Sequence, residues 1–179
     1  MSISGGIPEM NSSDVSTEAE PIHLLSDKWT LWAHLPHDTN WSIDSYTKIC
    51  TFASIEESIA LCETLPEQMV RNCMLFLMKD DITPLWEDKQ NKQGGCFSFK
   101  VNNKNVISSW KRLVYCLVGN TITSNELLNK NITGITISPK KSFCIIKVWL
   151  SNTSFQNPRL LSETIGLKFE GCIFKKHMN

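Results

Sequence analysis

The chain has 179 residues, of which 41% are hydrophobic, and its formal net charge is zero. This length predicts a single domain with enough apolar side chains for a substantial core. The zero net charge hides an asymmetry, because residues 1–21 contain four acids and no lysine or arginine, whereas residues 130–179 contain eight basic residues and two acids. We therefore expect a disordered acidic tail over residues 1–21, a folded domain over residues 22–179, and an anionic ligand for the basic C-terminal third.

The cysteines and histidines give no sign of a metal site or a catalytic centre. The seven cysteines are dispersed without a CxxC pair, and most have apolar neighbours, which is typical of buried thiols in a reducing compartment. The four histidines lack nearby cysteine partners. We therefore expect no metal, no cofactor and no enzymatic activity. Because no apolar run is long enough to cross a membrane and the N-terminus lacks a secretion signal, we predict a cytoplasmic protein with no membrane partner.

Short apolar stretches separated by polar loops predict several strands. These cover residues 28–33, 46–52, 73–78, 96–101, 132–137, 143–149 and 172–174. A hairpin is expected after Trp86, with its turn at residues 92–95 and its returning strand at residues 96–101.

Capping residues and helical periodicity predict three helices. Ser54 and Glu57 form an S-x-x-E capping box for a helix over residues 54–65. A second helix spans residues 106–118, where apolar residues recur at helical spacing before a stop at Gly119. A third is expected to begin at Asn157 and Pro158 and to end near Gly166. Hairpin links, rather than regular alternation of strands and helices, predict an α+β domain: one curved antiparallel sheet with the helices on one face and a ligand on the other.

The segment TPLWEDKQNKQGGCF, residues 83–97, carries the strongest chemical signal. It places Trp86 next to Glu87 in a polar, glycine-closed segment. A guanine methylated at N7 is cationic, so an aromatic ring stacked on it gains a cation–π attraction of about 2 kcal/mol when desolvated. A carboxylate can accept hydrogen bonds from both N1–H and N2–H₂ on the base edge. Trp86 and Glu87 therefore suggest a pocket for a methylated guanine, to which Trp41 and Trp149 could be added by the sheet.

A structural role is the alternative for each of these tryptophans. A single tryptophan in a strand is more often part of a core than a ligand platform, and the dipeptide Trp-Glu is a weak signal by itself. Trp41 and Trp86, however, both lie in polar segments, where large aromatic residues are unusual as core. These facts favour the stacking interpretation without deciding it.

Five blocks along the chain resemble, in order and spacing, the eukaryotic translation initiation factor 4E family of mRNA cap-binding proteins. The blocks are HLLSDKWTLW, TNW, TPLWEDKQNKQGGCF, WKRLVYCLVG and ITGITISPKKSFCIIKVW, and the resemblance runs from about residue 23 to about residue 174. It implies an eight-stranded curved sheet with three helices on the convex face and a cap slot on the concave face.

The resemblance also assigns roles within the cap slot. Trp41 and Trp86 match the two stacking tryptophans, Glu87 the base-edge acceptor, and Trp149 the tryptophan that contacts the N7-methyl group. The phosphate side departs from the family.

Where the family usually has an arginine after the paired glycines this chain has Cys96, and Ile145 stands in place of a family lysine. Lys140 aligns with another family arginine. Since strand side chains alternate, Lys147 shares a face with Trp149. We therefore expect Lys140, Lys141 and Lys147 to hold the triphosphate.

The surface that receives the scaffold factor 4G in this family is altered more strongly. Ile59 and Ile55 replace a tryptophan and a valine of the family's first helix, and the entry motif has become His23-Leu24 without its proline. On the second helix a leucine, a glutamate and a leucine are replaced by Lys111, Arg112 and Tyr115. Because the usual partner motif brings a basic side chain to the position of Arg112, we predict weak binding of standard partner peptides and a preference for a different or acidic one.

Three possible functions of this protein are compared. The first is a non-enzymatic factor that binds the 7-methylguanosine cap and recruits capped mRNA through a 4G-type scaffold or a divergent substitute. The second is a cap-binding repressor or decoy that does not engage the usual scaffold. The third, an enzyme acting on capped or nucleotide substrates, lacks the acidic metal cluster or Cys–His pair that it would need.

Overall fold

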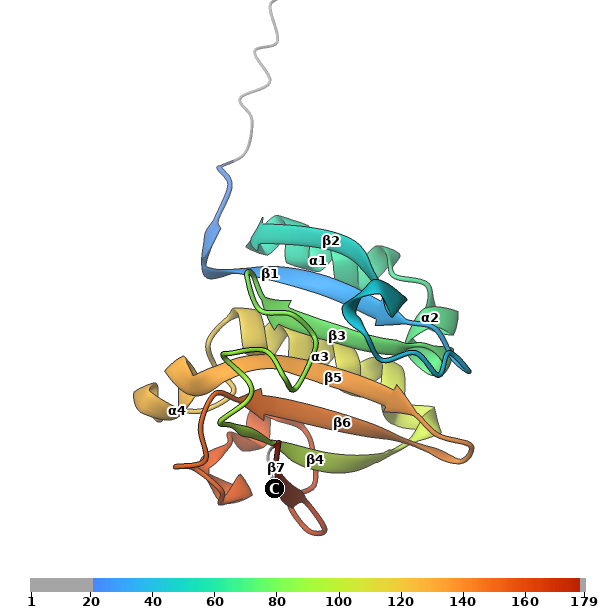
Figure 1. Cartoon of the computed structure of the whole chain (residues 1–179). Helices are drawn as coiled ribbons and strands as arrows, with labels where there is room; N and C mark the ends of the chain where they lie inside the picture. Colours follow the sequence, from blue (N-terminus) through green and yellow to red (C-terminus); the bar gives the residue numbers. More distant parts are fainter. Residues whose placement is uncertain (1–20, 178–179) are drawn as a thin grey trace, which may run out of the picture.

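The computed structural model describes residues 21–177, which form one antiparallel sheet with helices packed against it (Figure 1). The predicted acidic tail lies outside these residues. The sheet has seven strands in the order β2-β1-β3-β5-β6-β4-β7, and every paired neighbour is antiparallel. The strands are β1 (Leu24–His34), β2 (Tyr46–Ser54), β3 (Met74–Lys79), β4 (Gly95–Asn102), β5 (Ile132–Pro139), β6 (Phe143–Leu150) and β7 (Ile173–Lys176). The α+β class is confirmed, and the described residues contain seven strands where eight were expected.

Four α-helices accompany the sheet where three were expected. They are α1 (Ile55–Thr64), α2 (Glu67–Asn72), α3 (Val106–Val118) and α4 (Glu126–Asn131). The helices α1, α2 and α3 cover one face of the sheet, whereas α4 lies beside the beginning of β5 (Figure 1). Short 3-10 turns also occur at η1 (Ile43–Ser45), η2 (Asn103–Asn105), η3 (Pro158–Leu160) and η4 (Glu163–Ile165).

The two longer helices begin and end where the sequence indicates. Ser54 Oγ accepts a hydrogen bond from Glu57 N, and the Glu57 carboxylate accepts one from Ser54 N, so the predicted capping box of α1 is confirmed. The helix α3 buries Trp110, Leu113 and other apolar side chains against the sheet and ends before Gly119.

Two predicted elements are wrong. The predicted helix that starts at Asn157 is replaced by the turns η3 and η4, with Gly166 in the left-handed conformation after the second turn. The predicted hairpin after Trp86 is also wrong, because residues 80–94 form a loop and β4 pairs with β6 and β7.

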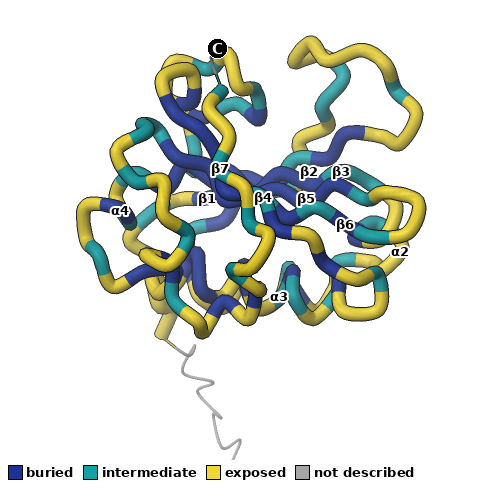
Figure 2. Tube along the Cα trace, turned by 90° about the horizontal axis from the view of Figure 1, so that it is seen from below, coloured by how far each residue is buried: buried dark blue, intermediate teal, exposed yellow. Residues whose placement is uncertain are grey.

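Apolar side chains form two clusters, one on each face of the sheet. The larger cluster fills the space between the sheet and the helices. The smaller cluster lies on the opposite face, which we call the open face, and contains Phe76, Met78, Ile82, Cys96 and Trp149. The helix α3 lies to one side of the layer of largely buried strands (Figure 2). Within residues 21–177 no helix has the length and apolar character needed to span a bilayer.

Candidate functional site

The open face carries two rows of side chains that run across the sheet from strand to strand. Cross-strand pairing defines one row as Thr30, Met78, Gly134, Trp149, Cys96 and Lys175. The neighbouring row consists of Lys48, Trp32, Phe76, Thr136, Lys147, Ser98 and Ile173. The register of β6 with β4 is unbroken from Lys147 to Trp149, so these two residues, two positions apart, point to the same face as expected.

A continuous series of aromatic contacts crosses the same face. Its members, in order, are Trp41, His34, Tyr46, Phe76, Trp149 and His177, and successive ring centroids are 4.3, 4.9, 5.3, 6.4 and 4.7 Å apart. The series links the loop after β1 with the end of β6 and with the residue that follows β7. Residues more than a hundred positions apart in sequence thus contribute to one aromatic surface.

Trp41 stands on this surface as an exposed platform. Its side chain is 54% exposed, and its ring stacks on His34 with an interplanar angle of 1°. His34 is buried and its Nε2 lies 2.8 Å from the carbonyl oxygen of Asn40, so this nitrogen carries the proton and donates. The histidine is therefore fixed by the loop it supports, and only one face of the Trp41 ring remains available for stacking.

Trp86 is the second exposed tryptophan, with 46% of its surface accessible, and it lies in the loop between β3 and β4. Asp88 organises that loop by accepting hydrogen bonds from Thr83 N, Thr83 Oγ1 and Gln90 N. Burial opposes ionisation of Asp88, but these hydrogen bonds outweigh it and hold the pKa of the carboxyl below its ordinary value. The fully buried Asn91 donates to the carbonyl of Leu85, which fixes the other end of the turn.

Glu87, beside Trp86, is exposed. Burial raises the pKa of Tyr46 to about 12, and the Glu87 carboxylate contributes to this rise. Tyr46 in turn packs edge-on against His34, which carries Trp41. The Glu87 carboxylate is therefore near enough to Tyr46 to affect its ionisation.

Trp149 is only 6% exposed and packs between Phe76 and His177. The family resemblance predicted a contact of Trp149 with the ligand, and in the structure Trp149 belongs to the apolar cluster on the open face. Several buried polar atoms on this face have no hydrogen-bond partner among the described residues. These are Trp32 Nε1, Thr136 Oγ1, Trp149 Nε1 and His177 Nε2. Buried polar groups are normally paired, so these atoms are exceptions to that rule, as are Trp29 Nε1 and Thr133 Oγ1 elsewhere in the sheet.

The three lysines expected to hold phosphate occupy different places. Lys147 is half-buried and lies two residues from Trp149 on β6, about 6.6 Å along the strand. Lys140 and Lys141 are exposed in the turn between β5 and β6, at the other end of β6 from Trp149. None of the three forms an ion pair with a described residue.

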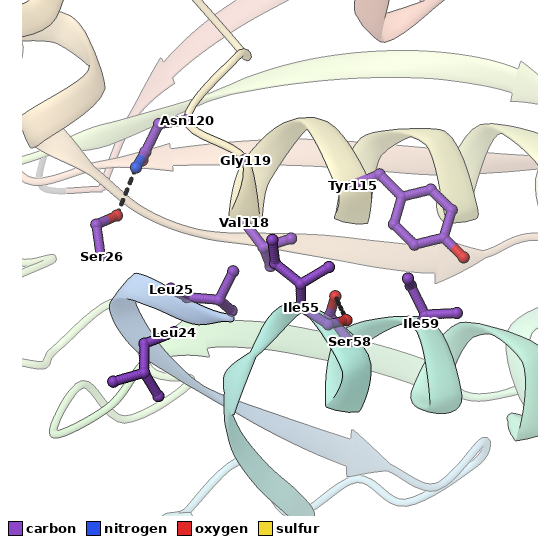
Figure 3. Close-up of a pocket in the computed structure, with 10 residues that line it drawn as sticks. All are labelled: Leu24, Leu25, Ser26, Ile55, Ser58, Ile59, Tyr115, Val118, Gly119 and Asn120. Carbon is purple, nitrogen blue, oxygen red and sulfur yellow. Dashed lines mark hydrogen bonds between the residues drawn. The ribbon is translucent and has the colours of Figure 1, made fainter. Parts of the chain in front are cut away.

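The helical side of the sheet carries an apolar groove of about 600 Å³ between β1, α1 and α3 (Figure 3). Four of the residues predicted to meet a protein partner line it, namely Leu24, Ile55, Ile59 and Tyr115. Ile59 and Tyr115 face each other across the gap between α1 and α3 (Figure 3). The groove is therefore open and apolar although its sequence departs from the family pattern.

The other three predicted partner residues lie outside the groove lining. His23 Nδ1 is 2.6 Å from a Glu56 carboxylate oxygen. Lys111 pairs with Glu63 at 3.0 Å. The side chain of the exposed Arg112 lies against Gly166. A Cβ added to Gly166 would be only 2.6 Å from Arg112 Nη1. The structure thus brings the apolar members of the predicted set together and directs the charged ones to other neighbours.

Sequence reasoning missed His34, Tyr46, His177 and Lys175 as neighbours of the site. The period-two alternation from Trp32 and from Phe174 could have placed His34 and Lys175 on a defined face. His177 could not be found this way, because its contact with Trp149 depends on the pairing of β7 with β4.

Comparison with known proteins identifies the family of this chain. The model of the family described as eukaryotic initiation factor 4E matches residues 24–177. The eukaryotic translation initiation factor 4E of Eremothecium gossypii is 31% identical over 158 residues, covering 84% of this chain and 71% of the relative. That of Candida albicans is 26% identical over 162 residues, covering 85% and 76%.

Solved structures show the same fold. The complex of C. elegans eIF4E-3 with the 4E-binding protein Mextli and a cap analog superposes with a TM-score of 0.76 at 21% identity, covering 88% of this chain and 94% of that one. Schistosome eIF4E complexed with m7GpppG and 4E-BP gives a TM-score of 0.69 at 24% identity, with coverage of 81% and 79%. The chain belongs to the eukaryotic initiation factor 4E family of non-enzymatic, cap-binding translation initiation factors.

Proposed function

We propose that this protein binds the 7-methylguanosine cap of mRNA by stacking the base between Trp41 and Trp86. Glu87 accepts hydrogen bonds from N1–H and N2–H₂ of the base, and Trp149 lies against the N7-methyl group. The observation that carries this proposal is the aromatic series on the open face, which supports an exposed Trp41 at one end and contains Trp149 near the other. Two stacked indoles would each contribute on the order of 2 kcal/mol to binding of the cationic base.

The positions of the lysines support a triphosphate that runs along β6, from Trp149 toward the turn between β5 and β6. Lys147 is nearest to Trp149 and would meet the first phosphates. Lys140 and Lys141 lie farther along the β5–β6 hairpin and would meet the outer phosphates or the following nucleotide. Phosphate contacts make affinity depend on salt, so replacing Lys147 with alanine should weaken binding and reduce the salt dependence.

The cellular role proposed is recruitment of capped mRNA for translation initiation in the cytoplasm. A relative with the same fold has been solved with both a cap analog and a 4E-binding protein, and another with m7GpppG and 4E-BP. The open apolar groove beside α1 supports docking of a scaffold protein of 4G type or of a divergent substitute. The second candidate, a cap-binding repressor or decoy, is motivated by Lys111 and Arg112 beside this groove.

Tryptophan fluorescence titration tests cap binding directly. The wild-type protein should show quenching with 7-methyl-GTP and much weaker binding of GTP, because only the methylated base is cationic. Trp41→Ala and Trp86→Ala should each lower the affinity for 7-methyl-GTP at least tenfold. Leu35→Ala is the matched control, since Leu35 is exposed in the same loop as Trp41 but has no aromatic ring. Equal affinity for GTP and 7-methyl-GTP would contradict the proposal.

A pull-down from the native cell separates the initiation factor from the repressor. Recovery of a 4G-type scaffold together with capped mRNA supports recruitment. Recovery of capped mRNA without initiation components supports the repressor. A pull-down with the Ile59→Asp variant, which places a charge in the groove, controls for partners that bind elsewhere.

A further inference from the structure

We propose that Lys175 of β7 is an additional phosphate-binding residue, which together with Lys147 forms a cationic edge around Cys96 beside the methylguanine site. This inference rests on the proposed cap-binding function and extends it to the C-terminal strand. It assigns a role to a residue whose position on the open face depends entirely on the pairing of β7.

Strand register places Lys175 on the ligand side of the sheet. Cys96 of β4 pairs directly with Trp149 on one side and with Lys175 on the other. Since adjacent strands lie about 4.8 Å apart, the backbone at Lys175 is about 10 Å from that at Trp149, across one intervening residue. Lys147 of β6 pairs with Ser98, which is two positions from Cys96 along β4. Lys147 and Cys96 therefore lie on the same face of the sheet. Two long cationic side chains thus flank a small one.

No described residue forms an ion pair with either lysine, Lys147 or Lys175. Burial raises the pKa of the Cys96 thiol, although Lys147 and Lys175 both act to lower it. Their charges are therefore close enough to act on Cys96, yet the thiol stays protonated and neutralises neither of them.

Trp149 supplies an independent sign of a missing partner at this place. Its side chain is 94% buried, and its Nε1–H has no acceptor among the described residues. Two ammonium groups that lack an anionic partner among the described residues, on one face beside this buried donor, favour a phosphate over an uncharged ligand.

The next residue on the strand offers a matched control. Lys176 pairs with Gly95 and therefore points to the opposite side of the sheet from Lys175, although both are exposed lysines of the same short strand. The variants Lys175→Gln and Lys176→Gln remove the same charge from adjacent positions. Affinity for 7-methyl-GTP and for the nucleoside 7-methylguanosine is measured by calorimetry at several salt concentrations.

Lys175→Gln should weaken binding of 7-methyl-GTP about two- to fivefold, leave the nucleoside affinity unchanged, and reduce the slope of log affinity against log salt by about one. Lys176→Gln should match the wild type in all three measurements. Equal results for the two variants would overturn the role of Lys175 while leaving cap binding intact. A parallel loss of nucleoside affinity in Lys175→Gln would also overturn it, because the residue would then act through the fold. Failure of the wild-type protein to prefer 7-methyl-GTP over GTP would instead remove the proposed function itself.

Discussion

The stacking of Trp41 on His34 shows how a buried residue can prepare an exposed one for a ligand. A tryptophan at 54% exposure in a loop would ordinarily sample several rotamers. His34 restricts it through a parallel contact of 4.3 Å and is itself held by the carbonyl of Asn40. Fixing one side chain before binding saves about 0.5 to 1.5 kcal/mol of ordering free energy.

Replacing His34 tests this positioning role. His34→Ala should lower affinity for 7-methyl-GTP about two- to tenfold, because Trp41 must then be ordered on binding. His34→Phe keeps an aromatic platform but loses the hydrogen bond to Asn40, so its affinity should lie between those of the wild type and the alanine variant. Fluorescence titration measures both affinities, and thermal unfolding checks that both variants are folded. Equal affinities for the alanine variant and the wild type would show that the stack does not position Trp41.

At the scale of secondary structure, periodic segments could be predicted and short or capped turns could not. The strands around Trp149 and the helix α1 were predictable because apolar alternation and the Ser54–Glu57 capping box are local signals. The six-residue helices α2 and α4 were missed because so few residues show no helical period. Asn157 does cap a turn, accepting from Arg159 N, but the same signal serves a 3-10 turn as well as a helix.

The same division holds for the candidate site. Trp86, Glu87 and the parity of Lys147 follow from local sequence and from the family resemblance. The aromatic series does not, because it depends on which strands are neighbours in the sheet and on the register between them. Long-range pairing is also what places the C-terminal strand beside Cys96.

A histidine directly after β7 links pH to stability through its titration. His177 Nδ1 lies 2.8 Å from the carbonyl oxygen of Asn91 and therefore donates to it, and the ring packs on Trp149 beside Lys147. Burial lowers the pKa of His177 below its ordinary value of 6.5, and the charge of Lys147 acts in the same direction. Protonation therefore favours the unfolded chain, in which the imidazole is solvated.

We expect the contribution of His177 to stability to be fully present above pH 6.5 and to be lost as pH falls from 6.5 through the lower pKa of the folded state. His177→Gln can still donate to Asn91 but cannot take up a proton, so its free energy of unfolding should fall less between pH 7.5 and pH 5.5. Urea denaturation across this range measures the difference. His37→Asn is the control, because His37 is an exposed residue with a positive φ that asparagine tolerates. The same pH dependence in wild type and His177→Gln would show that another group is responsible.

At the scale of the whole molecule, the sheet separates two surfaces that can be occupied together. The aromatic series, Lys147 and Lys175 lie on the open face. The apolar groove lies on the helical side, between β1, α1 and α3 (Figure 3). The strand β1 contributes to both, with His34 near one end and Leu24 at the other. Substitutions on the helical side should therefore change partner binding without changing cap affinity.

Arg112 provides the sharpest test of that separation. Standard partner peptides are expected to bring a basic side chain toward this position, so like charge should weaken their binding. Arg112→Glu should then tighten binding of a 4G-type peptide by about two- to fivefold at low salt, and the gain should shrink as salt is added. Affinity for 7-methyl-GTP should be unchanged. Lys104→Glu, at an exposed site in η2 away from the groove, makes the same change in net charge and should not tighten peptide binding. A wild-type protein that already binds the peptide tightly, or equal gains in both variants, would show that repulsion at Arg112 does not select the partner.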